Sequence, residues 1–166
     1  MKVFKCLLIL VFASRCWAAA GHGDRQEAEY YVTAYAQHYA VPVEFVRALI
    51  EQESAWRKCA ISSKGAAGLM QLMPDTARRL GVQDRCDVEQ NISGGVRHLA
   101  YLMTKFHGDL RLVAAAYYAG ERVVEARGLR YSNPDVVMYV ARLRAGFERQ
   151  KQFQSAKLES ILRRTR

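Results

Sequence analysis

The chain has 166 residues and a formal net charge of +9, a length that suits one domain with a hydrophobic core of its own. The charge is uneven, because residues 141–166 hold eight Lys or Arg against two Glu, whereas residues 21–140 hold 14 basic and 14 acidic residues. The basic character therefore belongs to a C-terminal tail and not to a binding face of the domain, and the export signal described next leaves the protein little access to nucleic acid.

The N-terminus predicts a secretory signal peptide over residues 1–20. Lys2 and Lys5 precede a short apolar run, and three alanines at 18–20 supply a small-residue cleavage site. The run is too short to cross a bilayer, which needs about 20 apolar residues. No later segment is apolar enough to do so, and we expect a periplasmic mature chain without a transmembrane segment. A buried N-terminal helix is the weaker alternative, because the segment shows no amphipathic pattern.

Beyond the signal peptide, capping residues and glycines divide the chain into helices, and no run alternates with the period of two that is typical of strands. The expected elements, in chain order, are a helix over 26–40, a helix from Pro42 to about Ser54, a loop over 57–68, a short helix from Pro74 to near Gly81, a long helix capped by Asn91 and ending at His107, a helix capped by Asp109 and ending at Gly120, a short helix to Gly128, and a last helix that starts at Asn133 and Pro134. The sequence thus predicts a mainly α single domain over residues 21–146.

A basic tail over residues 147–166 follows the predicted domain. The simpler interpretation of this tail is a solvated, partly frayed helix. The alternative is a segment that binds anionic wall polymers or a membrane surface.

Removal of the signal peptide leaves two cysteines, Cys59 and Cys86. An even pair in an oxidising compartment favours a disulfide, which would tie the loop after Ser54 to the segment before Asn91. Two buried free thiols are the alternative.

One of the three glutamates in the second helix differs from the others in its position. At about 100° per residue, Glu53 projects onto the middle of the helix's apolar arc, whereas Glu44 and Glu51 lie on the opposite side. Desolvation raises the pKa of a carboxyl group, and a general acid needs a raised pKa to work near neutral pH. Glu53 is therefore either a catalytic acid or a structural carboxylate paired with a buried arginine.

A glycine-punctuated loop with the sequence SSKGAAGLMQLMP follows over residues 62–74. Small residues at 65–68 let the backbone approach another surface closely. Gln71 offers a donor and an acceptor, which suits amides and sugar hydroxyls. Met70 and Met73 offer adaptable apolar surface, or else simply fill the core.

Together these residues resemble the catalytic domain of the soluble lytic transglycosylases, which have a goose-type lysozyme-like fold. The resemblance rests on Glu53-Ser54 followed at this spacing by the Gly-Leu-Met-Gln of residues 68–71. Later motifs occur in the family's order, and these are Asn91-Ile92 with Gly94-Gly95 and Leu99, the Ala-Tyr-Tyr-Ala-Gly of residues 116–120, and Tyr139-Val140. The resemblance covers about residues 30–145 and implies a lysozyme-like single domain.

The resemblance also implies roles for ten residues. Glu53 matches the catalytic acid and base, and Ser62 matches a serine close to it. The positions that match the wall of the glycan groove or tyrosines near the catalytic centre are Gly68, Leu69, Met70, Gln71, Met73, Tyr117 and Tyr139. Tyr118 stands where the family usually has an asparagine that contacts the N-acetyl group of the substrate, which leaves open how this chain holds that group.

The implied reaction uses one carboxyl group and neither a metal nor a cofactor. Protonated Glu53 would give its proton to the bond between N-acetylmuramic acid and N-acetylglucosamine in peptidoglycan, while the acetamido oxygen stabilises the sugar cation. Glu53 would then take the proton of the C6 hydroxyl, whose oxygen closes on C1 and leaves a 1,6-anhydro end without consuming water. The histidines show no spacing typical of zinc ligands.

Two other functions remain open. A hydrolytic muramidase on the same scaffold needs a second carboxylate to position water, and Asp75, Asp84 and Asp87 match no such position in the family. A non-catalytic, peptidoglycan-binding assembly subunit would agree with Tyr118 but not with the retained Glu53. The small single-domain form resembles transglycosylases that open the wall locally for a secretion, conjugation or pilus apparatus, which is the expected partner beside the glycan strands.

Overall fold

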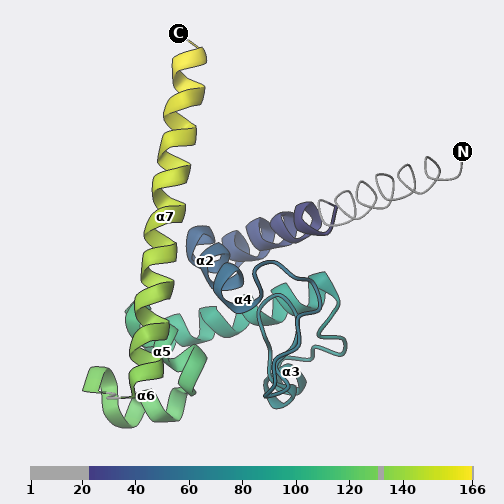
Figure 1. Ribbon diagram of the computed structural model, residues 1–166, viewed down its shortest axis with the longest axis vertical. Helices are drawn as coiled ribbons and strands as arrows, with labels where there is room; N and C mark the ends of the chain where they lie inside the picture. Colours follow the sequence, from purple (N-terminus) through teal and green to yellow (C-terminus); the bar gives the residue numbers. More distant parts are fainter. Residues whose placement is uncertain (1–22, 131–132, 166) are drawn as a thin grey trace, which may run out of the picture.

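The computed structural model describes residues 23–130 and 133–165, so the signal peptide predicted over 1–20 lies outside the described residues. In chain order the elements are a helix over 23–38, α2 (Val43–Ser54), α3 (Pro74–Arg79), α4 (Val88–Lys105), α5 (Leu110–Ala119), α6 (Glu121–Arg127), a 3₁₀ turn η1 (Gly128–Arg130) and α7 (Pro134–Arg164) (Figure 1). The described residues form no strand, and the prediction of a mainly α chain is confirmed. None of the described helices is both long and apolar enough to cross a membrane.

Two predicted helix caps are formed as expected. The side chain of Asp109 accepts the backbone N–H of Arg111 at 2.9 Å at the start of α5. The side chain of Asn133 likewise accepts the N–H of Asp135 at 2.9 Å, with Pro134 at the first position of α7. Each cap gives a partner to an N–H that has none within its helix.

The prediction that Asn91 caps the long helix is wrong. The helix α4 begins at Val88, and its cap is Asp87, whose side chain accepts the N–H of Gln90 at 2.9 Å. Asn91 lies one turn further along and is completely buried. Asp and Asn are equally good capping residues, so residue type alone could not separate the two positions.

The helix α2 lies in the hydrophobic core. Val46, Leu49 and Ile50 have no exposed surface and belong to the same cluster as buried residues of α4, α5 and α7. The first half of α7 packs against α2 and α5, with Tyr139 and Leu143 turned inward. This packing brings the start of α7 beside the end of α2, where Gln52 donates to the carbonyl of Tyr139 at 3.2 Å.

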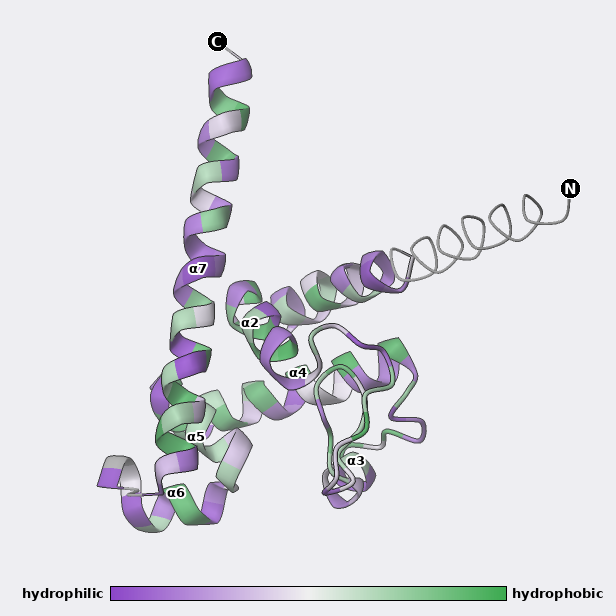
Figure 2. Cartoon of the chain, in the orientation of Figure 1, coloured by the Kyte–Doolittle hydropathy of each residue, from purple (hydrophilic) through white to green (hydrophobic). Residues whose placement is uncertain are grey.

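The segment predicted as a basic tail continues α7 without a break at residue 147. The last part of α7 projects beyond the rest of the fold (Figure 1), and hydrophilic and hydrophobic residues alternate along it (Figure 2). Its exposed large apolar residues are Phe153, Leu158, Ile161 and Leu162. This end of the chain is therefore a helix with apolar side chains that the fold leaves uncovered.

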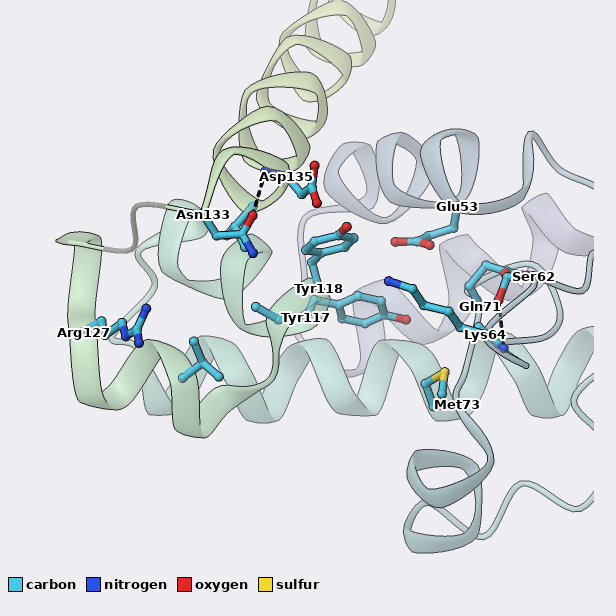
Figure 3. A pocket seen from close by; sticks show the side chains of 14 residues that line it. Glu53, Ser62, Lys64, Gln71, Met73, Tyr117, Tyr118, Arg127, Asn133 and Asp135 are labelled. Atoms are coloured by element: carbon cyan, nitrogen blue, oxygen red, sulfur yellow. Dashed lines mark hydrogen bonds between the residues drawn. The ribbon is translucent and has the colours of Figure 1, made fainter.

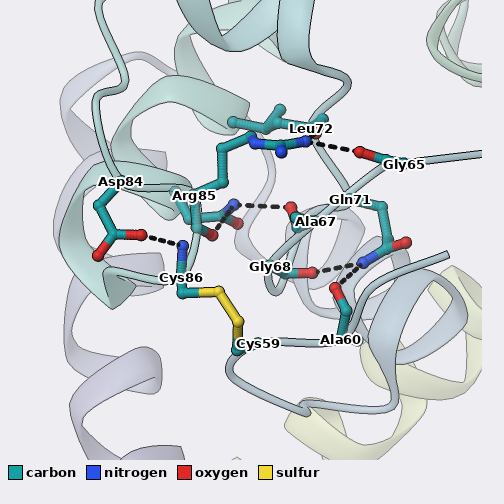
Figure 4. The surroundings of a disulfide bond; sticks show 11 residues. Cys59, Ala60, Gly65, Ala67, Gly68, Gln71, Leu72, Asp84, Arg85 and Cys86 are labelled. Atoms are coloured by element: carbon teal, nitrogen blue, oxygen red, sulfur yellow. Dashed lines mark hydrogen bonds between the residues drawn. A yellow bond between two sulfur atoms is a disulfide. The ribbon is translucent and has the colours of Figure 1, made fainter.

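A disulfide and an arginine cross-link the irregular segment between α2 and α4 (Figure 4). Cys59 and Cys86 are joined in a disulfide, and their Cα atoms lie 4.7 Å apart. The guanidinium of Arg85 donates to the carbonyl of Gly65 at 2.6 Å and to that of Leu72 at 3.1 Å. Both links join the loop after α2 to the segment that precedes α4.

The amide of Asn91 lies at the centre of the same segment. Its Oδ1 accepts the N–H of Met70 at 2.8 Å, and its Nδ2 donates to the carbonyls of Ala67 at 3.1 Å and Arg85 at 2.8 Å. Gly68 allows this close approach, because its φ is +85° and a Cβ there would collide with Arg85 O and the Asn91 amide. One buried side chain thus fixes the loop that follows α2.

Candidate active site

A pocket of about 500 Å³ opens where the end of α2, the loop before α3, the ends of α5 and α6, and the start of α7 meet (Figure 3). Six of the ten residues singled out in the sequence line it, and these are Glu53, Ser62, Gln71, Met73, Tyr117 and Tyr118. The pocket therefore gathers residues from segments between positions 53 and 136 of the predicted domain.

Glu53 is the next-to-last residue of α2 and lies partly buried in the pocket wall. Its Oε1 accepts a hydrogen bond from the hydroxyl of Tyr139. Burial raises the pKa of Glu53 above its ordinary value of 4.5, and the Tyr139 hydrogen bond, which favours the carboxylate, offsets part of the rise. The carboxyl group thus keeps its proton to higher pH than an exposed glutamate and can donate it to a ligand in the pocket.

Tyr139 comes from α7 and does not itself line the pocket, since it is buried behind Glu53 and Tyr118. Burial holds the pKa of Tyr139 well above its usual value, so the hydroxyl stays a neutral donor. Tyr118 stacks on the Tyr139 ring, with centroids 4.5 Å apart and an interplanar angle of 23°. Tyr118 is 45% exposed, so it covers the buried tyrosine and leaves ring surface free for a ligand.

Other predicted residues form the layer that supports the wall. The hydroxyl of Tyr117 donates to the carbonyl of Met70 at 2.7 Å and thereby joins α5 to the loop. Gly68, Leu69 and Met70 do not line the pocket, and their buried side chains or backbone belong to the interior. Met73, by contrast, is exposed and lines the pocket.

Gln71 and Ser62 are more constrained than the sequence suggested. The Nε2 of Gln71 donates to the carbonyls of Ala60 at 2.8 Å and Gly68 at 2.9 Å, which uses both amide hydrogens. The amide group of Gln71, which was expected to donate to a ligand, therefore donates within the protein instead. Only its oxygen is left for a ligand. The Oγ of Ser62 accepts the N–H of Ala66 at 3.0 Å and holds the turn of the loop.

Four polar residues of the pocket were missed by the sequence interpretation, and these are Lys64, Arg127, Asn133 and Asp135. In Figure 3 the ammonium group of Lys64 points into the pocket toward Glu53, whereas Asp135 lies beyond Tyr118. Neither Lys64 nor Asp135 stands in a local pattern that differs from an ordinary surface residue. Asp135 follows Asn133 and Pro134, so its place beside a helix start was foreseeable, but its place in the pocket was not.

The three acids weighed from the sequence serve the structure elsewhere. Asp75 pairs with Arg78 at 2.6 Å, Asp84 accepts the N–H of Cys86 at 2.8 Å, and Asp87 caps α4. None of the three lines the pocket, whereas Asp135 does. The second carboxylate of the pocket is therefore Asp135.

The sequence has relatives among peptidoglycan-cleaving enzymes. It matches the sequence model of the family described as Transglycosylase SLT domain over residues 30–137. Over 109 residues it is 40% identical to the membrane-bound lytic murein transglycosylase F of Salmonella choleraesuis strain SC-B67, a match that covers 58% of this chain and 21% of that protein.

Solved structures agree with this match. An inactive mutant of the lytic transglycosylase Slt from Pseudomonas aeruginosa has a TM-score of 0.68 and 25% identity, covering 76% of this chain and 24% of that one. The 70 kDa soluble lytic transglycosylase of Escherichia coli has a TM-score of 0.66 and 26% identity, with 75% and 24% covered. The predicted lysozyme-like fold is confirmed by these likenesses, although the chain spans only about a quarter of the length of each protein.

Proposed function

Since the chain belongs to the family of the transglycosylase SLT domain, we propose that it is a lytic transglycosylase that cleaves the glycan strands of peptidoglycan. The observation that carries this proposal is the state of Glu53. Its carboxyl group faces a pocket, is bonded to Tyr139, and has a pKa that burial raises above its ordinary value. These are the properties of a general acid that works near neutral pH.

The first half of the reaction uses protonated Glu53 as the acid. Its proton passes to the oxygen between N-acetylmuramic acid and N-acetylglucosamine, and the bond from that oxygen to C1 breaks. The acetamido oxygen of the N-acetylmuramic acid stabilises the cation at C1. The neutral hydroxyl of Tyr139 then donates to the new carboxylate, whose charge would otherwise be poorly solvated in its partly buried position.

The second half uses the same residue as a base. The Glu53 carboxylate takes the proton of the C6 hydroxyl, the oxygen closes on C1, and a 1,6-anhydro end forms without a water molecule. Burial favours the acid and the Tyr139 hydrogen bond favours the carboxylate, so the two effects act on the pKa of Glu53 in opposite directions, and burial is the larger.

Hydrolysis is the second candidate, and Asp135 is the observation that favours it. A hydrolase needs a second carboxylate to activate water, and Asp135 lines the pocket together with Glu53. Lytic cleavage remains the better supported reaction, because the family and the named relatives are transglycosylases.

Product analysis tests both reactions. Peptidoglycan is digested with the wild type, Glu53→Gln and Asp135→Asn, and the muropeptides are analysed by mass spectrometry. We expect anhydro ends, one water lighter than reducing ends, from the wild type and from Asp135→Asn, and none from Glu53→Gln. Reducing ends that disappear with Asp135→Asn would assign a hydrolase instead. A folded wild type that yields no product would favour the non-catalytic assembly subunit.

The cellular setting belongs to the same proposal. The basic start and alanine site of the N-terminus support export to the periplasm. There the enzyme would open the wall locally for a secretion, conjugation or pilus apparatus. Deletion of the gene should then impair assembly of one such apparatus and leave bulk wall turnover unchanged, and the reverse pattern would contradict this role.

A further inference from the structure

One side of the projecting part of α7 carries a row of basic and apolar side chains. Arg149, Phe153, Lys157 and Ile161 follow one another at intervals of four residues, so each is the surface neighbour of the next and together they form one continuous row that winds slowly around the helix. We call these four residues the basic row. All four are exposed, Phe153 by 64% and Ile161 by 49%.

The cations of the basic row lack acidic partners. Within the described chain neither Arg149 nor Lys157 forms an ion pair. Two other cations of the same helix are paired instead, and these pairs are Lys151 with Glu148 at 3.7 Å and Arg163 with Glu159 at 4.0 Å. The positive charge on the side of the basic row is therefore not neutralised within the protein.

A groove of about 460 Å³ adds to this charge where the basic row begins. Arg149 and Lys157 line one wall, and Arg25 of the first described helix lines the other. Glu29 is the sole carboxylate among the described residues that line the groove, and it is held by Arg47 at 2.8 Å. Three cations of the groove are thus left without a balancing anion.

This combination of charges and apolar side chains complements one kind of surface. Anionic headgroups attract unpaired cations, and apolar side chains between them can enter the headgroup region of a bilayer. A symmetric contact between two copies of the chain would bring the unpaired cations of both rows into one interface, and the basic row supplies no anion to balance them. We propose that the basic row docks α7 on an anionic phospholipid membrane.

Docking would also place the pocket relative to the membrane. A helix rises about 1.5 Å per residue, so Arg149 lies about 20 Å along α7 from Asp135 in the pocket. The pocket and the basic row therefore occupy different parts of one helix. A docked chain would therefore hold its pocket about 20 Å along α7 from the start of the basic row.

Two double variants with the same net charge test the proposal. Arg149→Gln with Lys157→Gln removes the unpaired cations of the basic row, and Lys151→Gln with Arg163→Gln removes two cations that are already paired with glutamates. Each protein is sedimented with vesicles of phosphatidylcholine alone or with added phosphatidylglycerol, after circular dichroism has shown that the fold is intact. A third variant, Phe153→Gln with Ile161→Gln, removes the apolar contribution.

We expect the wild type to bind the vesicles that contain phosphatidylglycerol and not those of phosphatidylcholine alone. Loss of the two row cations should weaken this binding about thirtyfold, since each cation near an anionic surface contributes about fivefold. The control variant Lys151→Gln, Arg163→Gln should bind almost as tightly as the wild type. The Phe153→Gln, Ile161→Gln variant should bind weakly.

Other results would overturn the proposal. Equal losses from both charge pairs, or no loss from the apolar variant, would mean that only diffuse charge attraction acts. Row-dependent binding to purified peptidoglycan without vesicle binding would identify a wall polymer as the ligand. A dimer in light scattering that the apolar variant abolishes, again without vesicle binding, would identify a second copy of the chain.

Discussion

The ring of Tyr118 lies almost parallel to the ring of Tyr139, with the two centroids 4.5 Å apart. Tyr139 in turn donates its hydroxyl hydrogen bond to Glu53. The substituted position of the family motif is therefore in contact with the partner of the proposed acid. A change at residue 118 should act on Glu53 through Tyr139 as well as on any ligand in the pocket.

Removing the hydroxyl of Tyr139 should change the pH dependence of the reaction. In Tyr139→Phe the hydrogen bond that favours the Glu53 carboxylate is lost, so the pKa of Glu53 should rise further. We expect the alkaline limb of kcat/KM to move to higher pH, with a lower maximal rate. Tyr117→Phe is the matched control, because its hydroxyl bonds Met70 O and not Glu53. If the alkaline limb does not move in Tyr139→Phe, or moves equally in both variants, then the Tyr139 hydrogen bond does not set the pKa of Glu53 in the reaction.

Replacing the proposed acid should stabilise the fold at neutral pH. Because burial raises the folded-state pKa of Glu53, the folded protein binds more protons than the unfolded chain, and its stability falls as pH rises from the unfolded pKa through the folded pKa. Glu53→Gln avoids the buried charge. Its Tm should therefore exceed that of the wild type above the folded pKa of Glu53, and the difference should shrink below pH 4.5, the ordinary pKa of a glutamate. Thermal melts between acidic and neutral pH measure this, and an advantage that persists unchanged in acid would contradict it.

The Tyr118 ring should matter more than its hydroxyl group. Tyr118→Ala removes a stacked aromatic pair, which contributes about 1 kcal/mol to the free energy of unfolding, and opens the Tyr139–Glu53 bond to water. We expect kcat/KM to fall about tenfold, equivalent to about 1.4 kcal/mol of transition-state stabilisation. Tyr118→Phe keeps the ring and should stay close to the wild type in both stability and rate. Equal losses in the two variants would instead point to the hydroxyl as a ligand contact.

Truncating Asn91 should be among the most destabilising single changes. Asn91→Ala leaves the Met70 N–H and the Ala67 and Arg85 carbonyls without the amide, and buried unsatisfied groups cost about 1–3 kcal/mol each. We expect the free energy of unfolding in urea to drop by about 3 kcal/mol or more. The loss should stay below the full sum for three buried groups, because the Arg85 carbonyl is only partly buried and water can reach it. Asn91→Asp should not rescue it, because a carboxylate oxygen would then face two carbonyl oxygens. A small loss in either variant would contradict the network.

Breaking the disulfide should destabilise the loop that carries the pocket. Cys59 and Cys86 are 27 residues apart, and closing a loop of that length corresponds to about 3.5 kcal/mol in the chain-entropy treatment. The double variant Cys59→Ser, Cys86→Ser should lose most of that stability in urea unfolding. Reducing agent should destabilise the wild type and leave the double variant unchanged. Sensitivity of both proteins to the reductant would mean that its effect lies elsewhere.

Local signals in the sequence were enough for most of the fold. Asp109 and Asn133 are followed directly by helical segments, so their capping roles depend on neighbours within a few residues. Glu53 could be singled out because helical periodicity places it on an apolar arc. A carboxyl group there is desolvated, so it must be paired or have a raised pKa. In each case the deciding information lies within one or two turns of helix.

Features that depend on tertiary contacts could not be obtained in this way. Asn91 was assigned as a cap because nothing in its own helix shows that its amide lies within hydrogen-bonding distance of Met70 and Arg85. Lys64 and Asp135 are far apart in the sequence and share a pocket only because the start of α7 folds back to the loop after α2. Such convergence is a property of helix packing and leaves no local pattern in either segment.

The orientation of Gln71 makes this part of the pocket wall a hydrogen-bond acceptor only. Its two amide hydrogens are donated to Ala60 O and Gly68 O, so the side chain can offer a ligand only the lone pairs of its oxygen. A sugar can satisfy it only through an O–H or N–H group that points at it. If the sugar hydroxyl that faces the Gln71 oxygen were converted to a methyl ether, two hydrogen-bond acceptors would meet. Glycans methylated at that hydroxyl should therefore not bind in the pocket, although the rest of the sugar is unchanged.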